Sequence, residues 1–369
     1  MATMKAARLY KVGEPMRIES MSKPEPSAND VLVRVRACGI VPNLANILTN
    51  WQTWFPELPL PPLPAIFGLD PAGEIVAVGS HVHTWKQGDR VYVNPGRYCG
   101  GCRPCRSGDL VHCTHYTFNG YFGFSPDSWK IYKNYPYGGL CEYMTAPQYS
   151  LVKLPDNVSF EQGARFGYLG TMYSALRKTA IAPGKTLLVN GISGTLGIGG
   201  PLLALAMGAN KIFGTGRNLE LLKRVKALAP DRIEVLSIED GEPIDQWIKR
   251  KTAGLGVDVF VDALGPGARH ETFLQGMRAL RRGGRAVNIG AIAGAVGMDL
   301  HTMMDEGQSV QGSIWFNAGE GQDMADMAEA GTMDLSIFEH TVFPLEQVNE
   351  AISGIAVRNG GFSNYIIAP

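Results

Sequence analysis

Four cysteines stand close together in the segment Tyr98–Cys113, which reads YCGGCRPCRSGDLVHC. They are Cys99, Cys102, Cys105 and Cys113, with the spacing C-x2-C-x2-C-x7-C. Four thiolates on a loop that contains glycine and proline can complete the tetrahedral shell of a zinc ion, and they leave no position for water or substrate. We therefore expect a structural zinc site; the alternatives are an iron–sulfur cluster and a loop without metal.

A glycine-rich turn follows the apolar run Thr186–Asn190 (TLLVN) and precedes a helical pattern at Pro201–Gly208. A strand, a tight glycine turn and a helix N-terminus form an anion site, because backbone N–H groups and the helix dipole face the phosphate. The spacing GxxGxxG would by itself also fit a structural turn, but the strand and the helix around it favour a dinucleotide site. The residues that would form it are Gly191, Ser193, Gly194, Thr195, Leu196 and Gly197.

The end of the next strand indicates which dinucleotide binds. This strand, Lys211–Gly214, leads into Thr215, Gly216, Arg217 and Asn218. An NAD site usually carries an acidic residue here, whereas a small residue leaves room for the 2′-phosphate of NADP and a guanidinium binds it. We expect NADP(H); the alternative is that Arg217 is an ordinary solvated arginine at a helix start. At the ends of two later strands, Ala263 and Gly290 are expected to line the same site.

The order of predicted elements places these motifs in two kinds of structure. The first part reads as β, with half-buried or short β-branched runs at Val31–Ala37, Gly73–Gly79 and Arg90–Val93. From about Thr171 strands alternate with helices, which predicts a doubly wound parallel sheet. The strands expected in it are Thr186–Asn190, Lys211–Gly214, Val257–Asp262, Arg285–Gly290 and Ser309–Trp315. The tail from Leu345, a helix and then the strand Tyr365–Ile367, is expected to return to the first part.

Length and composition limit the classes of function. The 369 residues suit two domains. Lys+Arg and Asp+Glu balance at 34 each, so no electrostatic argument favours nucleic acid or an anionic membrane as a partner. The start, Met1–Tyr10, has no continuous apolar region, and no apolar run is long enough to span a bilayer. We expect a cytoplasmic protein, where clustered cysteines indicate a metal rather than disulfides.

Taken together, these motifs resemble the medium-chain dehydrogenase/reductase superfamily, which includes zinc alcohol dehydrogenases and zinc-free quinone and enone reductases. The resemblance also rests on the segment around Cys38, on Phe67–Gly79, on the run from Gly88 to Val91 and on Gly138–Tyr143. It implies a catalytic, GroES-like distorted β-barrel domain at 1–167 and 313–369, with the zinc lobe near 95–115. A Rossmann domain at 168–312 would bind NADP. The resemblance further implies that Thr171 lies beside the nicotinamide and that a homodimer forms through Ser309–Phe316.

The chain departs from the zinc alcohol dehydrogenases at the catalytic metal. In those relatives a cysteine, a histidine and a further cysteine or acidic residue hold the ion. The cysteine matches Cys38 in this chain. The histidine position is occupied by Leu69, and the third ligand position falls near Gly167. The relay hydroxyl and the relay histidine fall at Ile40 and near Asn43. One cysteine does not hold zinc by itself. The run Gly39–Asn43 and the run Gly68–Gly73 look more like the zinc-free reductases, which generally lack the cysteine lobe.

Without a Lewis acid, the substrate must be polarised by hydrogen-bond donors, an acid or water. We therefore expect reduction of a conjugated carbonyl or another activated double bond, with a ketone–alcohol exchange or a non-catalytic NADPH-binding protein as alternatives. The candidate catalytic residues are Asp70, which could donate a proton, Tyr168, which could donate to the substrate oxygen, and Cys38, a possible weak donor. Their alternative roles are the cap of a helix or turn that begins at Pro71, a domain-interface aromatic and a small buried residue.

Two aromatic segments, Asn50–Pro64 and Tyr116–Tyr137, suggest a bulky, mostly apolar small-molecule substrate. The residues expected to line its pocket are Asn43, Trp51, Trp54 and Leu69. The alternative is that these segments pack on their own core or on a partner subunit.

Overall fold

A computed structural model describes residues 2–369. Its central part is a six-stranded, fully parallel sheet with the strand order β13-β12-β11-β14-β15-β16. In chain order this is 3-2-1-4-5-6, the arrangement of dinucleotide-binding Rossmann folds. The strands are β11 (Thr186–Asn190), β12 (Lys211–Gly216), β13 (Ile233–Ser237), β14 (Val257–Asp262), β15 (Leu280–Asn288) and β16 (Ser309–Gly312).

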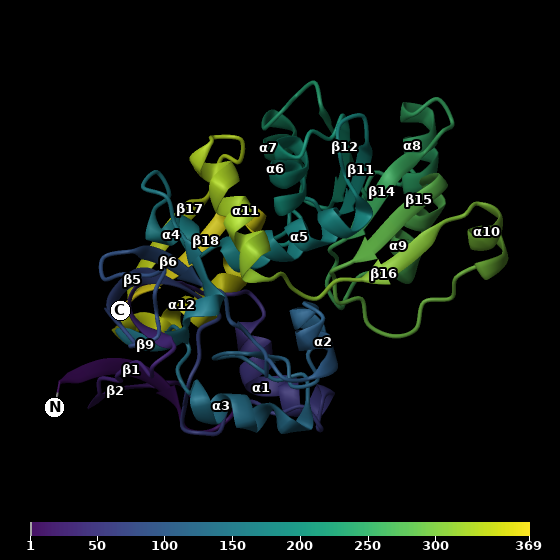
Figure 1. Cartoon of the computed structure of the whole chain (residues 1–369). Coiled ribbons are helices and arrows are strands. Elements are labelled where there is room, and N and C mark those ends of the chain that lie inside the picture. The colour runs from purple at the N-terminus through teal and green to yellow at the C-terminus, as the bar shows by residue number, and fades with distance from the viewer. Residues whose placement is uncertain (1) are drawn as a thin grey trace.

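Helices cover both faces of this sheet because side chains alternate between the faces. Leu188 of β11 and Phe260 of β14 pack in one buried cluster with Trp247, whereas Leu187 and Val189 belong to the cluster that continues into the rest of the molecule. The helices are α5 (Phe166–Thr179), α6 (Gly199–Ala206), α7 (Leu219–Ala227), α8 (Ile244–Lys251), α9 (His270–Arg278) and α10 (Leu300–Asp305). Figure 1 shows this part in teal and green.

The two ends of the chain build the other part together, which Figure 1 shows in purple to blue and in yellow. Its main sheet has the order β10-β6-β5-β3-β18-β17, with β9 also paired to β3, and a second sheet has the order β2-β1-β4. The C-terminal strand β18 pairs antiparallel with β3, so the chain returns as expected. The chain therefore has the predicted fold class, a Rossmann sheet combined with a GroES-like β-barrel.

The elements of this part have the following bounds. The strands are β1 (Thr3–Leu9), β2 (Arg17–Ser22), β3 (Asp30–Gly39), β4 (Ala65–Ile66), β5 (Asp70–Val78), β6 (Arg90–Val93), β7 (Gly96–Arg97), β8 (Thr117–Phe118), β9 (Tyr143–Pro147), β10 (Leu151–Lys153), β17 (Glu339–Pro344) and β18 (Ser363–Ala368). The helices are α1 (Leu44–Trp54), α2 (Arg103–Arg106), α3 (Trp129–Asn134), α4 (Phe160–Gly163), α11 (Ala318–Glu329) and α12 (Val348–Gly354).

Two expectations about local structure are wrong. Asp70 begins strand β5 instead of capping a helix or turn, because β5 pairs with β3 from Asp70 onward. The last Rossmann strand ends at Gly312, earlier than Trp315, because the side chains of Trp315 and Phe316 are buried against the barrel part. The domain boundaries at 167/168 and 312/313 stay a prediction; helix α5 runs across the first of them.

In residues 2–369 no helix is long and apolar enough to cross a membrane.

Candidate active site and metal centre

The four-cysteine cluster has the geometry of a zinc site. The Sγ atoms of Cys99, Cys102, Cys105 and Cys113 all lie within 4.8 Å of one another. The Sγ atom of Cys102 is 3.4 Å from that of Cys105 and 3.8 Å from that of Cys113. Zn–S bonds of about 2.3 Å give tetrahedral S–S edges of about 3.8 Å, so the four thiolates fit one zinc ion. Among residues 2–369 this is the one group of three or more His, Cys, Asp or Glu side chains that could hold a metal.

Adjacent strands bring Cys38 and Asp70 together at the position to which the family resemblance assigned a catalytic metal. In the β3–β5 ladder Gly39 faces Asp70 and Cys38 faces Pro71. Cys38 is fully buried, and a Cβ at Gly68 or Gly139 would lie only 2.9 or 2.7 Å from its Sγ. Burial raises the pKa of the Cys38 thiol. These contacts favour the alternative role of a small buried residue.

Asp70 is a buried carboxyl with one specific partner. It is 2 % exposed, and its Oδ1 accepts a hydrogen bond of 2.9 Å from the Tyr92 hydroxyl. Burial raises the pKa of Asp70 to about 7, while the Tyr92 hydrogen bond and the positive charge of Arg165 act in the opposite direction. A Cβ at Gly167 would lie 2.0 Å from Asp70 Oδ1. Glycine at 167 therefore supplies no metal ligand and at the same time makes room for this carboxyl group.

The start of helix α5 places a cation and a phenol near Asp70. Arg165 is buried, and its Nη2 donates to the carbonyls of Thr195 and Gly361, each at 3.0 Å. Its guanidinium lies 5.7 Å from the ring centroid of Tyr168. Tyr168 is partly buried; burial, and then the negative charge of Asp70, raise its pKa. The Tyr168 hydroxyl therefore stays protonated at neutral pH and can donate a hydrogen bond.

The four residues expected to line the substrate pocket lie at different depths. Trp51 is buried, stacks on Phe122 with ring centroids 3.9 Å apart, and donates from Nε1 to the Leu58 carbonyl. Leu69 is also buried, whereas Asn43 is exposed just before helix α1 and Trp54 is 47 % exposed at its end. These contacts favour a packing role for Trp51.

The glycine turn after β11 forms a narrow cradle. Gly191 has φ +75°, a conformation that favours glycine. Gly194 N donates to Gly191 O at 2.9 Å, and a Cβ at Gly197 would lie 2.0 Å from that oxygen. The C-terminal segment also touches this turn, since Gly361 N donates to Ser193 O at 2.8 Å. A turn this compact at the carboxyl end of the first strand fits the pyrophosphate of a dinucleotide.

Beside the turn, a cavity of about 450 Å³ opens at the carboxyl ends of the strands, with Arg217 and Leu264 in its lining. Gly216 faces this side of the turn, because a Cβ there would lie 3.1 Å from Ser193 Oγ. Arg217 is exposed. Asn218 caps helix α7, accepting from the backbone N–H groups of the next turn.

A buried polar network lies at the carboxyl ends of the strands beside this cavity. Asn190 accepts from Thr215 Oγ1 at 2.9 Å and donates to Asp262 Oδ1 at 3.3 Å. Burial raises the pKa of Asp262 to about 6. Ala263 N donates to Asn190 O at 3.1 Å, and a Cβ at Gly290 would lie 2.4 Å from Leu264 O. The network fixes the ends of three strands around the place where a nucleotide would lie.

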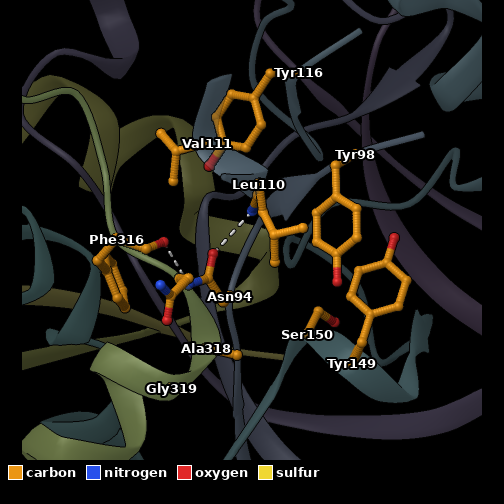
Figure 2. A pocket seen from close by; sticks show the side chains of 12 residues that line it. Asn94, Tyr98, Leu110, Val111, Tyr116, Tyr149, Ser150, Phe316, Ala318 and Gly319 are labelled. Carbon is orange, nitrogen blue, oxygen red and sulfur yellow. Dashed lines mark hydrogen bonds between the residues drawn. The ribbon is translucent and has the colours of Figure 1, made fainter. Parts of the chain in front are cut away.

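A second cavity of about 140 Å³ lies between the cysteine lobe, the barrel and the start of helix α11 (Figure 2). The Asn94 side chain lies in its wall; its Nδ2 donates to the Phe316 carbonyl at 3.1 Å, and its Oδ1 accepts from Gly96 N at 2.9 Å. The lining includes none of the predicted catalytic or substrate-pocket residues. Asn94 thus ties the segment that leaves the Rossmann sheet to the barrel.

Comparisons with known proteins decide the family. The family model of the alcohol dehydrogenase GroES-like domain matches residues 27–156, and that of the zinc-binding dehydrogenase matches residues 195–330. The chain is 32 % identical over 351 residues to an alcohol dehydrogenase of Geobacillus stearothermophilus, covering 94 % of each protein. The chain belongs to the medium-chain dehydrogenase/reductase superfamily.

Other members of the superfamily resemble the chain over its whole length. A quinone oxidoreductase of Sus scrofa is 27 % identical, with 99 % of this chain and 97 % of that protein covered. A solved structure described as a zinc-binding dehydrogenase from Sinorhizobium meliloti 1021, bound to NADP, superposes with a TM-score of 0.82 at 23 % identity and covers both chains fully. The relatives are dehydrogenases and oxidoreductases, which supports an enzyme of this superfamily.

The sequence did not predict several residues of the site. Tyr92 donates a hydrogen bond to Asp70, and the positive charge of Arg165 lowers the pKa of this carboxyl. Asn190 and Asp262 also escaped notice. Both end predicted strands, and a polar residue at the carboxyl end of a parallel strand is a signal that could have found them. Tyr92 gave no such signal, because it lies within the strand RVYV.

Proposed function

We propose that the chain is an NADP(H)-dependent reductase that acts without a catalytic zinc on a conjugated carbonyl, or another activated double bond, in a bulky and mostly apolar substrate. The observation that carries this proposal is the Asp70–Gly167 arrangement. The Asp70 carboxyl fills the space beside Gly167, where the family resemblance implies a third metal ligand, and Leu69 supplies no imidazole. Polarisation of the substrate then falls to hydrogen-bond donors, which suffices for a conjugated acceptor because its charge is delocalised.

The glycine turn and the end of β12 are the residues that would hold NADP(H). The backbone around Gly191–Gly197 would receive the pyrophosphate, and Ser193 Oγ and Arg217 would donate to the 2′-phosphate, with Gly216 in place of the acidic residue of an NAD site. Glu239, Glu242 and Glu271 line the same cavity as Arg217. The NADP-bound structural neighbour supports this assignment. When bound, NADPH supplies the hydride. Thr171, buried on helix α5, is proposed to lie beside the nicotinamide.

Two side chains would act on the substrate: one would bind its oxygen and the other would supply a proton. The hydroxyl of Tyr168, a partly buried residue, stays protonated and would donate a hydrogen bond to the substrate oxygen as negative charge builds there. Asp70 would then give its proton to the α-carbon of the enolate that hydride addition leaves, because a pKa of about 7 lets the carboxyl be both protonated and able to release the proton at neutral pH. Arg165 lies beside the Tyr168 ring and links this site to the glycine turn through the Thr195 carbonyl.

The test is NADPH oxidation with matched enones, saturated ketones and cyclic imines, using the native protein and Tyr168→Phe. We expect turnover of enones, and a fall in kcat of about a hundredfold in Tyr168→Phe, the usual loss when one donor to an oxyanion is removed. Tyr173→Phe is the matched control, because this tyrosine lies on the same helix but bonds Asp323 at 3.0 Å instead. Faster turnover of saturated ketones than of enones would contradict the proposal, and NADPH binding without any turnover would indicate a binding protein.

A further inference from the structure

Tyr92 occupies a defined place behind the proposed acid. It lies on β6, where it pairs with Ala72 of β5, two residues from Asp70. Its side chain is fully buried, and its hydroxyl donates to Asp70 Oδ1 at 2.9 Å. The Tyr92 ring lies next to two other rings, with its centroid 5.7 Å from that of Phe166 and 6.4 Å from that of Phe316. The phenol is therefore held by packing on its ring and by a single hydrogen bond at its tip.

Phe316, which packs against the Tyr92 ring, is itself held by two neighbours. Phe316 stacks on Tyr92 with an interplanar angle of 14°, and its carbonyl accepts from Asn94 Nδ2 (Figure 2). Trp315 Nε1 donates to Asn94 Oδ1 at 3.0 Å. A Cβ at Gly170 would lie 2.3 Å from the Phe316 ring, so this ring seats directly on helix α5. The ring that positions Tyr92 thus contacts both the barrel and the helix that carries Tyr168.

The groups that surround the Asp70 carboxyl come from four places in the fold. The titratable and charged groups coupled to it are Tyr92 on β6, Cys38 on β3, Arg165 and Tyr168 at the start of α5, and Tyr121 in the loop after β8. Tyr92 donates a hydrogen bond to the carboxyl, whereas Arg165 acts on it through its charge. A donor to an ionised carboxylate stabilises it more than a neutral hydrogen bond would.

We propose that Tyr92 is a positioning residue: its hydroxyl fixes the orientation of the Asp70 carboxyl and sets the pH at which this group gives up its proton. The inference rests on the proposed function in that Asp70 is the acid. When the carboxyl releases its proton to the reduced substrate, the negative charge stays on the carboxylate, next to the Tyr92 O–H. A proton from water restores the acid for the next turnover.

Tyr92→Phe keeps the ring and removes the hydrogen bond. The protonated Asp70 carboxyl is followed by its infrared carbonyl band, assigned by its loss in Asp70→Asn, and titrated in the protein without ligand. A donor to the ionised form favours ionisation, so its removal should move the midpoint of this band upward by about one pH unit or more. Tyr132→Phe is the matched control, since Tyr132 is equally buried and its hydroxyl contacts no hydrogen-bond partner in residues 2–369.

An unchanged or lower midpoint in folded Tyr92→Phe overturns the inference. Should that variant not fold, Phe316→Leu loosens the Tyr92 ring without removing its hydroxyl; a raised midpoint there supports the inference and an unchanged one overturns it. The pH profile of kcat for the best enone separates the two proposals. If the infrared midpoint moves and the alkaline limb of kcat does not, Tyr92 positions Asp70 but Asp70 is not the acid, and the proposed function is wrong at that step.

Discussion

The burial of Asp70 predicts a dependence of stability on pH that needs no substrate to measure. In the unfolded chain this carboxyl has its ordinary pKa of 3.8, whereas burial raises the pKa in the folded protein to about 7. Below pH 3.8 both states are protonated and the group makes no difference. As pH rises between these values the unfolded chain loses its proton first, so the folded state becomes less stable. Above pH 7 the loss is complete.

The magnitude follows from the width of this interval. Each pH unit corresponds to 1.36 kcal/mol for one proton, so an interval of about three units gives a loss of about 4 kcal/mol as an upper bound. Asp70→Asn carries no proton to lose. The free energy of unfolding of this variant, relative to the native protein, should therefore rise by up to about 4 kcal/mol between pH 4 and pH 8. Effects of the amide that do not depend on pH cancel in this difference.

Urea unfolding of both proteins at closely spaced pH values measures the difference, with Asp240→Asn as control because Asp240 is exposed on the loop after β13. The control should follow the native curve between pH 5 and pH 8. If Asp70→Asn also runs parallel to the native protein over this range, Asp70 ionises as an ordinary surface carboxyl, and the reasoning that makes it an acid near neutral pH is refuted.

Three further predictions concern cofactor, metal and assembly. NADPH should bind about ten- to a hundredfold more tightly than NADH, because a charge-assisted pair with a 2′-phosphate contributes about 1.5–3 kcal/mol. In a nucleotide fluorescence titration, Arg217→Ala should lose most of this difference in affinity and Gly216→Asp should reverse it. If Arg217→Ala weakens the binding of both nucleotides equally, the prediction is contradicted. Elemental analysis should find one zinc per chain, and Cys102→Ser should lower the melting temperature; two zinc ions per chain would mean that a catalytic metal site exists. Light scattering at micromolar concentration should find a dimer, because the edge of β16 is otherwise unpaired; a monomer would count against it.

The sequence predicted the elements that carry strong local patterns. The strands β6, β11 and β14 begin and end where their apolar runs do, because β-branched residues between polar or turn residues define both ends. The four-cysteine lobe and the glycine turn were also found, since their chemistry lies in short spacings within one segment. The strand β13 (IEVLS) was missed although Pro230–Asp231 before it and Asp240–Gly241 after it are turn signals, because Glu234 interrupts its apolar run.

The contacts around Asp70 join residues far apart in the chain, and no local pattern announces them. Tyr92 and Asp70 meet because β5 and β6 pair, and Phe316 reaches Tyr92 only after the chain has passed through the whole Rossmann sheet. The alternative role as a cap at Pro71 failed for the same reason. A local reading favours an Asp–Pro turn, but the ladder with β3 extends the strand back to Asp70.

Gly167 connects the expected absence of a catalytic metal to the chemistry that could replace it. A side chain with a lone pair at this position would collide with Asp70, since even a Cβ would lie 2.0 Å from Oδ1. The space therefore serves either a third ligand or the Asp70 carboxyl in its present position, but not both. Restoring a histidine at Leu69 alone would leave this conflict in place. Under the proposed function, the Asp70 carboxyl and the Tyr92 hydroxyl that orients it together take the place of a metal site.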